Sequence, residues 1–179
     1  MTPYVKRIYL SGASSLRSED TWESSMEPFV LEASGASTVS KLCVNALSLK
    51  ADLSGTSNCN IVGDFSTMNL ELSGASAATI SGTYDEIKMK ASGASKATII
   101  GEAQGIKANC SGSSRLNGYG LKVEDARIDC SGASRATIDV NKSLDVELSG
   151  ASTCHYRSEN SGLFVVPSVS RASSLKKID

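Results

Sequence analysis

The sequence predicts an all-β protein, a single-stranded right-handed parallel β-helix (β-solenoid) of about nine rungs, where a rung is one turn of the coil. Three observations predict this fold. The tetrapeptide Ser-Gly-Ala-Ser (SGAS), or a close variant, returns every 18–23 residues. Apolar and polar residues alternate on both sides of each copy, which is the period of a β-strand. Equivalent positions carry the same residue type from copy to copy, as expected when successive turns stack in register.

The repeat has nine copies and a nearly constant length. The copies begin at Ser11, Ser34, Ser54 (SGTS), Ser73, Ser92, Ser111 (SGSS), Ser131 and Ser149, with a degenerate copy at Ser170. Three consecutive intervals in the middle are 19 residues long. A helix is excluded because the apolar positions step by two and β-branched residues and glycine crowd the repeat. The right hand is expected because parallel strand crossovers almost always take it.

Each copy is expected to lie between two strands. In the segment LELSGASAATISG, the pattern places Leu70 and Leu72 inside before the tetrapeptide, and Ala78 and Ile80 inside after it. The intervening Glu71 faces solvent, as do its equivalents in other copies. A glycine-containing turn and a loop are then expected to lead to the next rung, with the turn residues Gly63, Gly82, Gly101 and Gly120.

The tetrapeptide itself is predicted to be a structural corner. Its glycine can adopt a positive φ without a steric penalty. Alanine would sit where a larger side chain clashes, and the serine hydroxyls would bond to nearby backbone groups. The alternative is a repeated hydroxyl surface for glycans or ice, which the variable spacing disfavours. The predicted corner glycines are Gly12, Gly35, Gly55, Gly74, Gly93, Gly112, Gly132 and Gly150.

We expect one domain over residues 1–179. Residues 1–30 would form an N-terminal cap and the first rung, and residues 31–179 the regular SGAS rungs with a degenerate C-terminal rung. The first repeat carries the insertion SEDTWESSMEPF, with the single tryptophan, Trp22. This insertion is interpreted as a cap or packing loop, with a tryptophan binding platform as the alternative.

Composition excludes several function classes. The formal net charge of −1 gives no reason to expect a nucleic-acid partner. No apolar run approaches the roughly 20 residues that span a bilayer. The first residues contain no segment long enough for a secretion signal, so in an exported protein that signal would already have been removed. Neither a metal-binding spacing of cysteine and histidine nor a cofactor motif is present, so no metal or cofactor is expected.

Two pairs of cysteines test the register of the repeat. Cys110 and Cys130 occupy one inward column in consecutive rungs, so they should be neighbours, either as buried thiols or as a disulfide. Cys59 and Cys154 share another column five rungs apart. At the strand spacing this is about 24 Å, which is too far for a disulfide.

The charged residues favour binding over catalysis. Acidic residues occur about once per rung among lysines and arginines, and the alternation contains no clustered carboxylates of the kind a glycosidase needs. The chain is therefore predicted not to be an enzyme. Lys96, Arg115 and Arg135 stand four residues after the first Ser of consecutive copies, and we call them the basic ladder. The ladder is a candidate site for anionic sugars or a partner's acidic groups, and the alternative is three exposed solubilising charges.

The repeated segments LxLSGAS, IDCSGASRATI and VELSGASTCHY, with the terminal SRASS, resemble a bacterial family of Bacteroides-type β-helix proteins described as putative auto-transporter adhesin, head GIN domain. The likeness covers roughly residues 29–178. It implies a β-helix in the cell envelope or outside the cell, with no catalytic residues to carry over. The expected function is a non-catalytic, adhesin-like interaction module whose partner is a polysaccharide or a surface protein. The alternatives are a carbohydrate-active β-helix enzyme, such as a polysaccharide lyase or hydrolase, and a purely structural spacer.

Overall fold

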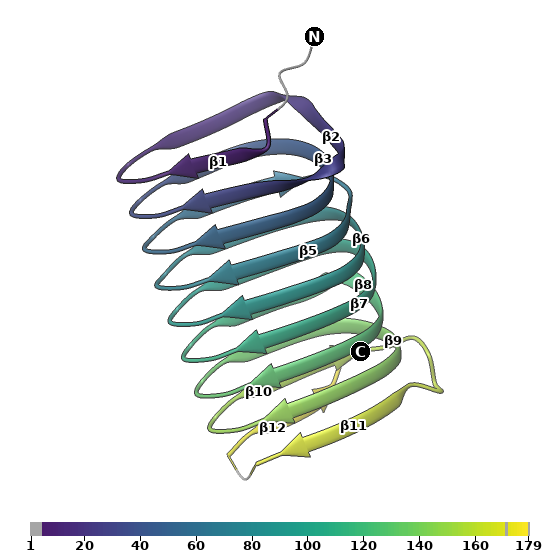
Figure 1. Cartoon of the computed structure of the whole chain (residues 1–179). Coiled ribbons are helices and arrows are strands. Elements are labelled where there is room, and N and C mark those ends of the chain that lie inside the picture. Colours follow the sequence, from purple (N-terminus) through teal and green to yellow (C-terminus); the bar gives the residue numbers. More distant parts are fainter. Residues whose placement is uncertain (1–4, 171, 179) are drawn as a thin grey trace.

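The computed structural model is a parallel β-solenoid of about nine turns, which confirms the predicted fold class (Figure 1). It describes residues 5–170 and 172–178. The hand of the coil stays a prediction. The strands of the described residues are β1 (Arg7–Leu10), β2 (Ser15–Ala33), β3 (Thr38–Leu53), β4 (Asn58–Val62), β5 (Phe65–Leu72), β6 (Ala77–Ala91), β7 (Lys96–Cys110), β8 (Arg115–Cys130), β9 (Arg135–Leu148), β10 (Thr153–Arg157), β11 (Phe164–Val169) and β12 (Ser174–Lys177).

Successive rungs pair side by side along the whole coil. The strand order is β1-β2-β3-β4-β6-β7-β8-β9-β10-β12, while β5 pairs with β3 and β6, and β11 pairs with β9. Strands β6, β7 and β8 each run nearly from one SGAS tetrapeptide to the next. A rung therefore has one tight corner, at the tetrapeptide, and one broad curve opposite it (Figure 1).

The expected glycine turn and loop are present at Gly63, between β4 and β5, but they are wrong for the later central rungs. Gly82 lies inside β6 and Gly101 inside β7, and the two are register partners. A strand continues through this curve because its hydrogen bonds go to the neighbouring rungs, so bending it does not break the pairing. Glycine is still needed there, since a Cβ on Gly101 would lie 1.8 Å from the carbonyl oxygen of Gly82. Gly120, expected in the same column, pairs with Ile100 because of a register shift between β7 and β8.

The inward columns are those that the alternation predicts. Leu70, Leu72, Ala78 and Ile80 are all buried, and Glu71 between them is exposed. The interior is filled mainly by aliphatic residues, alanine and cysteine stacked from rung to rung. Val169 holds the same column position in the last rung, yet it is 43% exposed because no described rung covers it.

The insertion in the first repeat forms strand rather than a loop. It lies within β2, which pairs with β3 through several register shifts. Trp22 is half-buried against the core, with its ring edge-on to Phe29 at a centroid distance of 6.4 Å. Trp22 therefore packs onto the N-terminal end of the core. Residues 1–4 of the predicted cap lie outside the described residues.

Candidate functional site

Each SGAS tetrapeptide forms a tight turn at the corner of a rung. All eight predicted corner glycines have a φ between 68° and 73°, which confirms the predicted bend. In two of the eight copies that contain glycine, the backbone N–H of the fourth residue donates to the carbonyl of the first, Ser76 to Ser73 at 3.4 Å and Ser114 to Ser111 at 3.3 Å. A hydrogen-bonded turn with a positive φ at its second residue only is a type II′ β-turn. Such a tight turn leaves the first serine of each copy on the surface.

The two serines of a copy lie in different environments. In the central copies the fourth serine is buried, and in most of them its hydroxyl donates to a backbone carbonyl, as Ser37 does to Ser34 at 2.7 Å and Ser152 to Cys130 at 3.1 Å. The prediction that serine hydroxyls satisfy the backbone is confirmed in these copies but not at Ser95, whose buried hydroxyl has no hydrogen-bond partner among the described residues. The third residue is exposed, and Thr56 and Ser113 occur there, so the expectation that only alanine fits is wrong.

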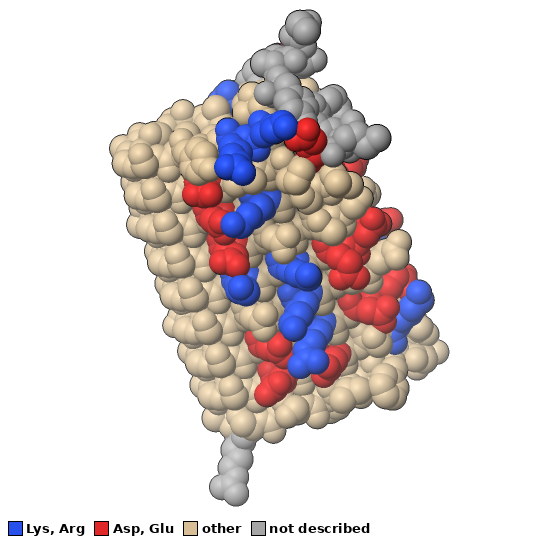
Figure 2. Space-filling model, viewed as in Figure 1, with Lys and Arg blue, Asp and Glu red and all other residues tan. Residues whose placement is uncertain are grey.

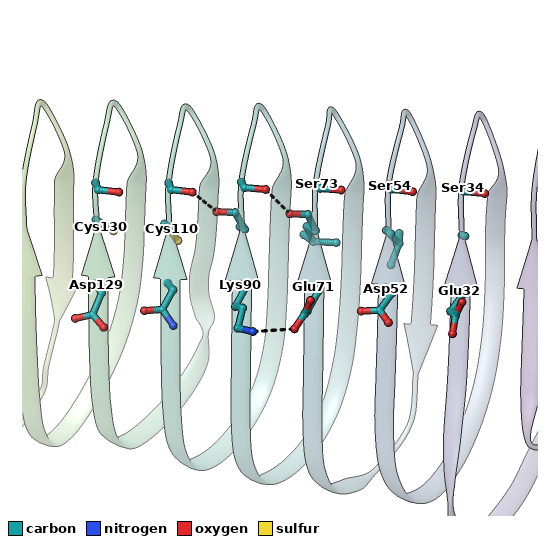
Figure 3. Close-up of a pocket in the computed structure, with 18 of the residues that line it drawn as sticks. Glu32, Ser34, Asp52, Ser54, Glu71, Ser73, Lys90, Cys110, Asp129 and Cys130 are labelled. Atoms are coloured by element: carbon teal, nitrogen blue, oxygen red, sulfur yellow. Dashed lines mark hydrogen bonds and ion pairs between the residues drawn. The ribbon is translucent and has the colours of Figure 1, made fainter.

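Stacked corners create a groove along the solenoid. Each rung contributes the first serine of the tetrapeptide and the two residues before it, such as Glu71, Leu72 and Ser73. The resulting SGAS groove crosses eight rungs, from Tyr9 to Ser149, with a cavity volume of about 900 Å³. Figure 3 shows the serines in one row and the charged side chains in a parallel row, with the strand between them.

Carboxylates gather at one end of the charged row. Glu32, Asp52 and Glu71 are register partners in three consecutive rungs. In the next rung Lys90 takes the same position and binds Glu71, with 3.0 Å between Nζ and Oε1. Figure 2 shows acidic side chains beside the uncharged corner edge. The SGAS groove thus has a hydroxyl row on one side and a mainly acidic row on the other.

Basic side chains on the same face compensate part of this charge. Lys50 lies 3.2 Å from Asp52, and Arg127 lies 3.6 Å from Asp129 and 3.2 Å from Asp145. Lys50 and Asp52 are two residues apart on one strand, as are Arg127 and Asp129, so the members of each pair lie on the same face. The Asp52 carboxylate raises the pKa of Lys50 through a hydrogen bond and its charge. These exposed pairs contribute little to stability, because water and salt screen their charges.

The basic ladder lies on the other side of the corner edge. Lys96 pairs in register with Arg115, and Arg115 with Arg135, so the three stack in consecutive rungs. All three are exposed, and in the described part of the chain none of them forms an ion pair. Like charges in directly paired positions repel one another. The structure thus brings the three residues together, as predicted.

The cysteines follow the predicted register. Cys110 and Cys130 are register partners at the floor of the SGAS groove, and all five cysteines are free thiols. Cys59 and Cys154 occupy one column five rungs apart, as expected. Burial raises the pKa of both Cys59 and Cys154 to about 12.

A second, shallower hollow of about 310 Å³ lies on the broad curve. Its polar groups bond to one another from rung to rung. Asp64 Oδ1 accepts hydrogen bonds from the N–H and hydroxyl of Thr83 at 3.0 and 2.7 Å, and Asn45 Oδ1 accepts from the N–H of Asp64 at 3.1 Å. These contacts hold the curve together, so we assign the hollow a structural role.

One partly buried ion pair was not predicted. The Arg157 guanidinium binds the buried Asp139 carboxylate, with 2.6 Å between Nη2 and Oδ2. The pair joins adjacent rungs at the C-terminal end. The register of the repeat could have predicted this pair, because it places Arg157 and Asp139 side by side in adjacent rungs. The described residues contain no group of three or more His, Cys, Asp or Glu that could hold a metal ion.

The acidic row is the feature that sequence reasoning missed. The alternation had assigned Glu32, Asp52 and Glu71 to one outward column, but it gave no indication that this column borders a groove. They are close enough to one another to meet the requirement of the enzyme alternative for neighbouring carboxylates. However, all three project from the same wall, whereas the two carboxyl groups of a glycosidase flank the scissile bond.

The fold and groove define a class: a repeat protein with a linear surface site along a β-solenoid. The sequence profile of the family described as putative auto-transporter adhesin, head GIN domain, matches residues 1–159, and the chain belongs to this family. The last rung, with β11 and β12, lies beyond the matched residues. No curated protein matches the chain, and no solved structure matches it either. None of the described residues forms a helix of the length and hydrophobicity that crosses a bilayer.

Proposed function

We propose that the chain is a non-catalytic, adhesin-like binding module that holds a linear polymer, a polysaccharide, in the SGAS groove. The observation that carries this proposal is the repetition of the groove. Each of eight rungs presents a similar set of groups at the strand spacing of about 4.8 Å. A site built from equal, evenly spaced subsites fits a ligand that is itself built from repeated units.

The groups in the groove suit a polysaccharide. Serine hydroxyls donate and accept hydrogen bonds, and carboxylates accept them, so both can bond to sugar hydroxyls. Contacts to successive units of one chain reinforce each other, because the first contact raises the effective concentration for the next. Weak contacts at each rung therefore add up to useful affinity. The family description implies an envelope or extracellular location, where such polymers occur.

The basic ladder supports a second contact surface for acidic ligands. Lys96, Arg115 and Arg135 are stacked, exposed and free of ion pairs among the described residues. Bringing an anionic sugar or an acidic partner to the ladder would relieve their mutual repulsion. We therefore propose that acidic glycans bind across the corner edge, with the ladder as their anchor.

One observation supports the alternative that the chain is a carbohydrate-active enzyme, namely the row of carboxylates in the groove. Lys90 neutralises Glu71 and Lys50 neutralises Asp52, which favours a binding or structural role for these acids. Release of shortened oligosaccharides from a bound polysaccharide, abolished by changing Asp52 to Asn, would replace our proposal with the enzyme alternative.

A glycan array with purified chain tests the proposal. We expect binding to a class of linear polysaccharides, and Ser73→Trp should weaken it at least about tenfold, a loss of about 1.4 kcal/mol, because the indole fills the middle of the groove. Asn60→Trp is the matched control, since Asn60 is exposed on β4 and does not line the groove. Absence of any bound glycan, or equal binding by both variants, would contradict the groove proposal.

The ladder is tested separately in the same array. Changing Lys96, Arg115 and Arg135 to serine should weaken binding to acidic glycans and leave neutral glycans unaffected. Binding of acidic glycans that is indifferent to this change would remove the ladder from the proposal while the groove result stands.

A further inference from the structure

Two neighbouring thiols lie beneath the SGAS groove and take no part in the proposed binding of a polysaccharide. Cys110 ends β7 and Cys130 ends β8, and the two are register partners. Both side chains belong to the same inward column, and each residue is 2% exposed. They therefore point in the same direction from directly adjacent strands.

The backbone already has a spacing that a disulfide accepts. Neighbouring strands lie about 4.8 Å apart, and the Cα atoms of disulfide-bonded cysteines are usually about 4.4–6.8 Å apart. The bond would need the two Cβ atoms to approach slightly, because paired side chains in a sheet stay near the strand spacing while a disulfide prefers about 3.5–4.5 Å. This small adjustment predicts a bond that forms but is reduced easily.

The other cysteines are poorer partners for this pair. Cys59 and Cys154 stand five rungs apart in their own column. Cys43 pairs in register with Thr21 and Val62. Cys154 is the competitor to consider, because it lies close enough to Cys130 for the charge of Cys130 to raise the pKa of Cys154.

The two thiols differ in acidity. The Cys110 thiol lowers the pKa of Cys130 through a hydrogen bond, and the Ser134 hydroxyl adds to this effect. The same contact and burial raise the pKa of Cys110. A more acidic thiol beside a less acidic one suits thiol–disulfide exchange, in which a thiolate attacks first and its neighbour completes the reaction.

We propose that Cys110 and Cys130 are a redox pair that forms a reversible disulfide joining two rungs beneath the SGAS groove. The oxidant is a small disulfide such as glutathione disulfide. The Cys130 thiolate attacks it, forming a mixed disulfide and releasing one glutathione thiolate. The Cys110 thiol then loses its proton and attacks the Cys130 sulfur, which releases the second glutathione. The two cysteines lose two electrons and two protons, and glutathione disulfide gains them.

The cross-link encloses one complete turn of the coil, residues 111–129. Closing this loop restricts the unfolded chain and fixes the two rungs in register. The envelope or extracellular location implied by the family is where such bonds persist.

The test counts thiols on the full chain. The reduced protein is held in a glutathione buffer with excess glutathione disulfide, both as folded chain and during refolding from urea, because burial slows access to the folded pair. After acid quenching and denaturation, the free thiols are alkylated and counted. We expect the count to fall from five to three, with a Cys110–Cys130 peptide in the digest and full recovery of five thiols after reduction.

Two variants make the result specific. Cys130→Ala should keep all four of its thiols, whereas Cys154→Ala, which lies beside the pair, should fall from four to two. The oxidised unchanged chain should also have a higher Tm than the reduced chain, and Cys130→Ala should show no such shift. Five remaining thiols in both arms, or a disulfide that maps to any other pair, would overturn the proposal.

Discussion

At the residue scale, the corner depends on a glycine that no other residue can replace without strain. Gly93 has a φ of 68°, and a Cβ added to it would lie 2.5 Å from the carbonyl oxygen of Gly74. The same contact recurs at the other corner glycines that have a rung before them. Glycine therefore allows both the backbone conformation and the close stacking of one corner on the next.

Gly12 allows the cost of the positive φ to be measured separately from the cost of close stacking between corners. It has a φ of 69° like the others, but a Cβ added to it would meet no atom within 4 Å. The positive φ of this turn position costs a residue with a Cβ about 1–2 kcal/mol. We expect Gly12→Ala to lower the free energy of unfolding by this amount, and Gly93→Ala to lower it by about 3 kcal/mol or more because of the added clash. Urea unfolding followed by circular dichroism measures both, and equal losses would show that stacking of the corners contributes nothing.

The corner glycines could be predicted because only glycine combines a positive φ with close backbone approach. Which serine faces inward was not predicted, since both ends of the tetrapeptide are serine. The alternation of buried and exposed residues nevertheless predicts which serine is buried. Ser37 lies an even number of residues from the buried Val39 and Ala33 is buried on the other side, so the alternation runs through the corner and places Ser37 inside. Ser34 falls in the other phase and is exposed.

At the scale of elements, the two kinds of bend tolerate change differently. The register is unbroken in the last six residues before a corner and through the start of the following strand, as from Pro28 to Ala33 in β2. The register shifts lie toward the broad curve, for example between Thr98 and Ile100. Variation in rung length is therefore absorbed in the curve. The sequence could not show this, because a glycine that bends a strand and one that ends it look alike.

The last rung needs protection because its strands have an open edge. β11 pairs only with β9 among the described strands, and its N–H groups point alternately toward β9 and away from it. Ser170 donates to Leu148 at 2.9 Å, so the nitrogen of Pro167 falls on the open side. Proline has no N–H to offer an incoming strand, which is a common way to block edge pairing.

We therefore expect Pro167→Val to increase self-association, because it restores an N–H on the open edge of β11 and adds a strand-forming side chain. The measurement is size-exclusion chromatography with light scattering over a range of concentrations. Ser168→Val is the matched control, since it adds the same side chain while its N–H already faces β9. If both variants associate equally, side-chain hydrophobicity rather than the missing N–H protects the edge.

At the scale of the whole molecule, no rung is stable alone. A central rung has 19 residues, and ordering each costs roughly 1–2 kcal/mol of backbone entropy. Its six buried apolar side chains contribute at most about 1.5–3 kcal/mol each. Neighbouring rungs supply the remaining burial and hydrogen bonds, so stability grows with the number of rungs. The stacking could be predicted from the repeat, but the SGAS groove could not, because its depth depends on how the corners protrude beyond the strands.

A molecule built this way should accept the loss of one complete rung. Deleting residues 73–91 joins Leu72 to Ser92 and removes one 19-residue interval, so every inward column stays in phase. We expect this variant to keep its β-sheet circular dichroism and to lose about 1–3 kcal/mol of unfolding free energy, at about 0.05–0.15 kcal/mol per residue.

Deleting residues 73–90 is the control, because it leaves Ala91 as one extra residue beside the corner. That residue turns the side chains of β5 to the opposite face, because a one-residue slip inverts a strand. The control should unfold at much lower urea than the complete-rung deletion, since the stiff corner cannot absorb the extra residue. Similar stability of the two variants would mean that corners and curves adapt equally and that the 19-residue period does not specify the register.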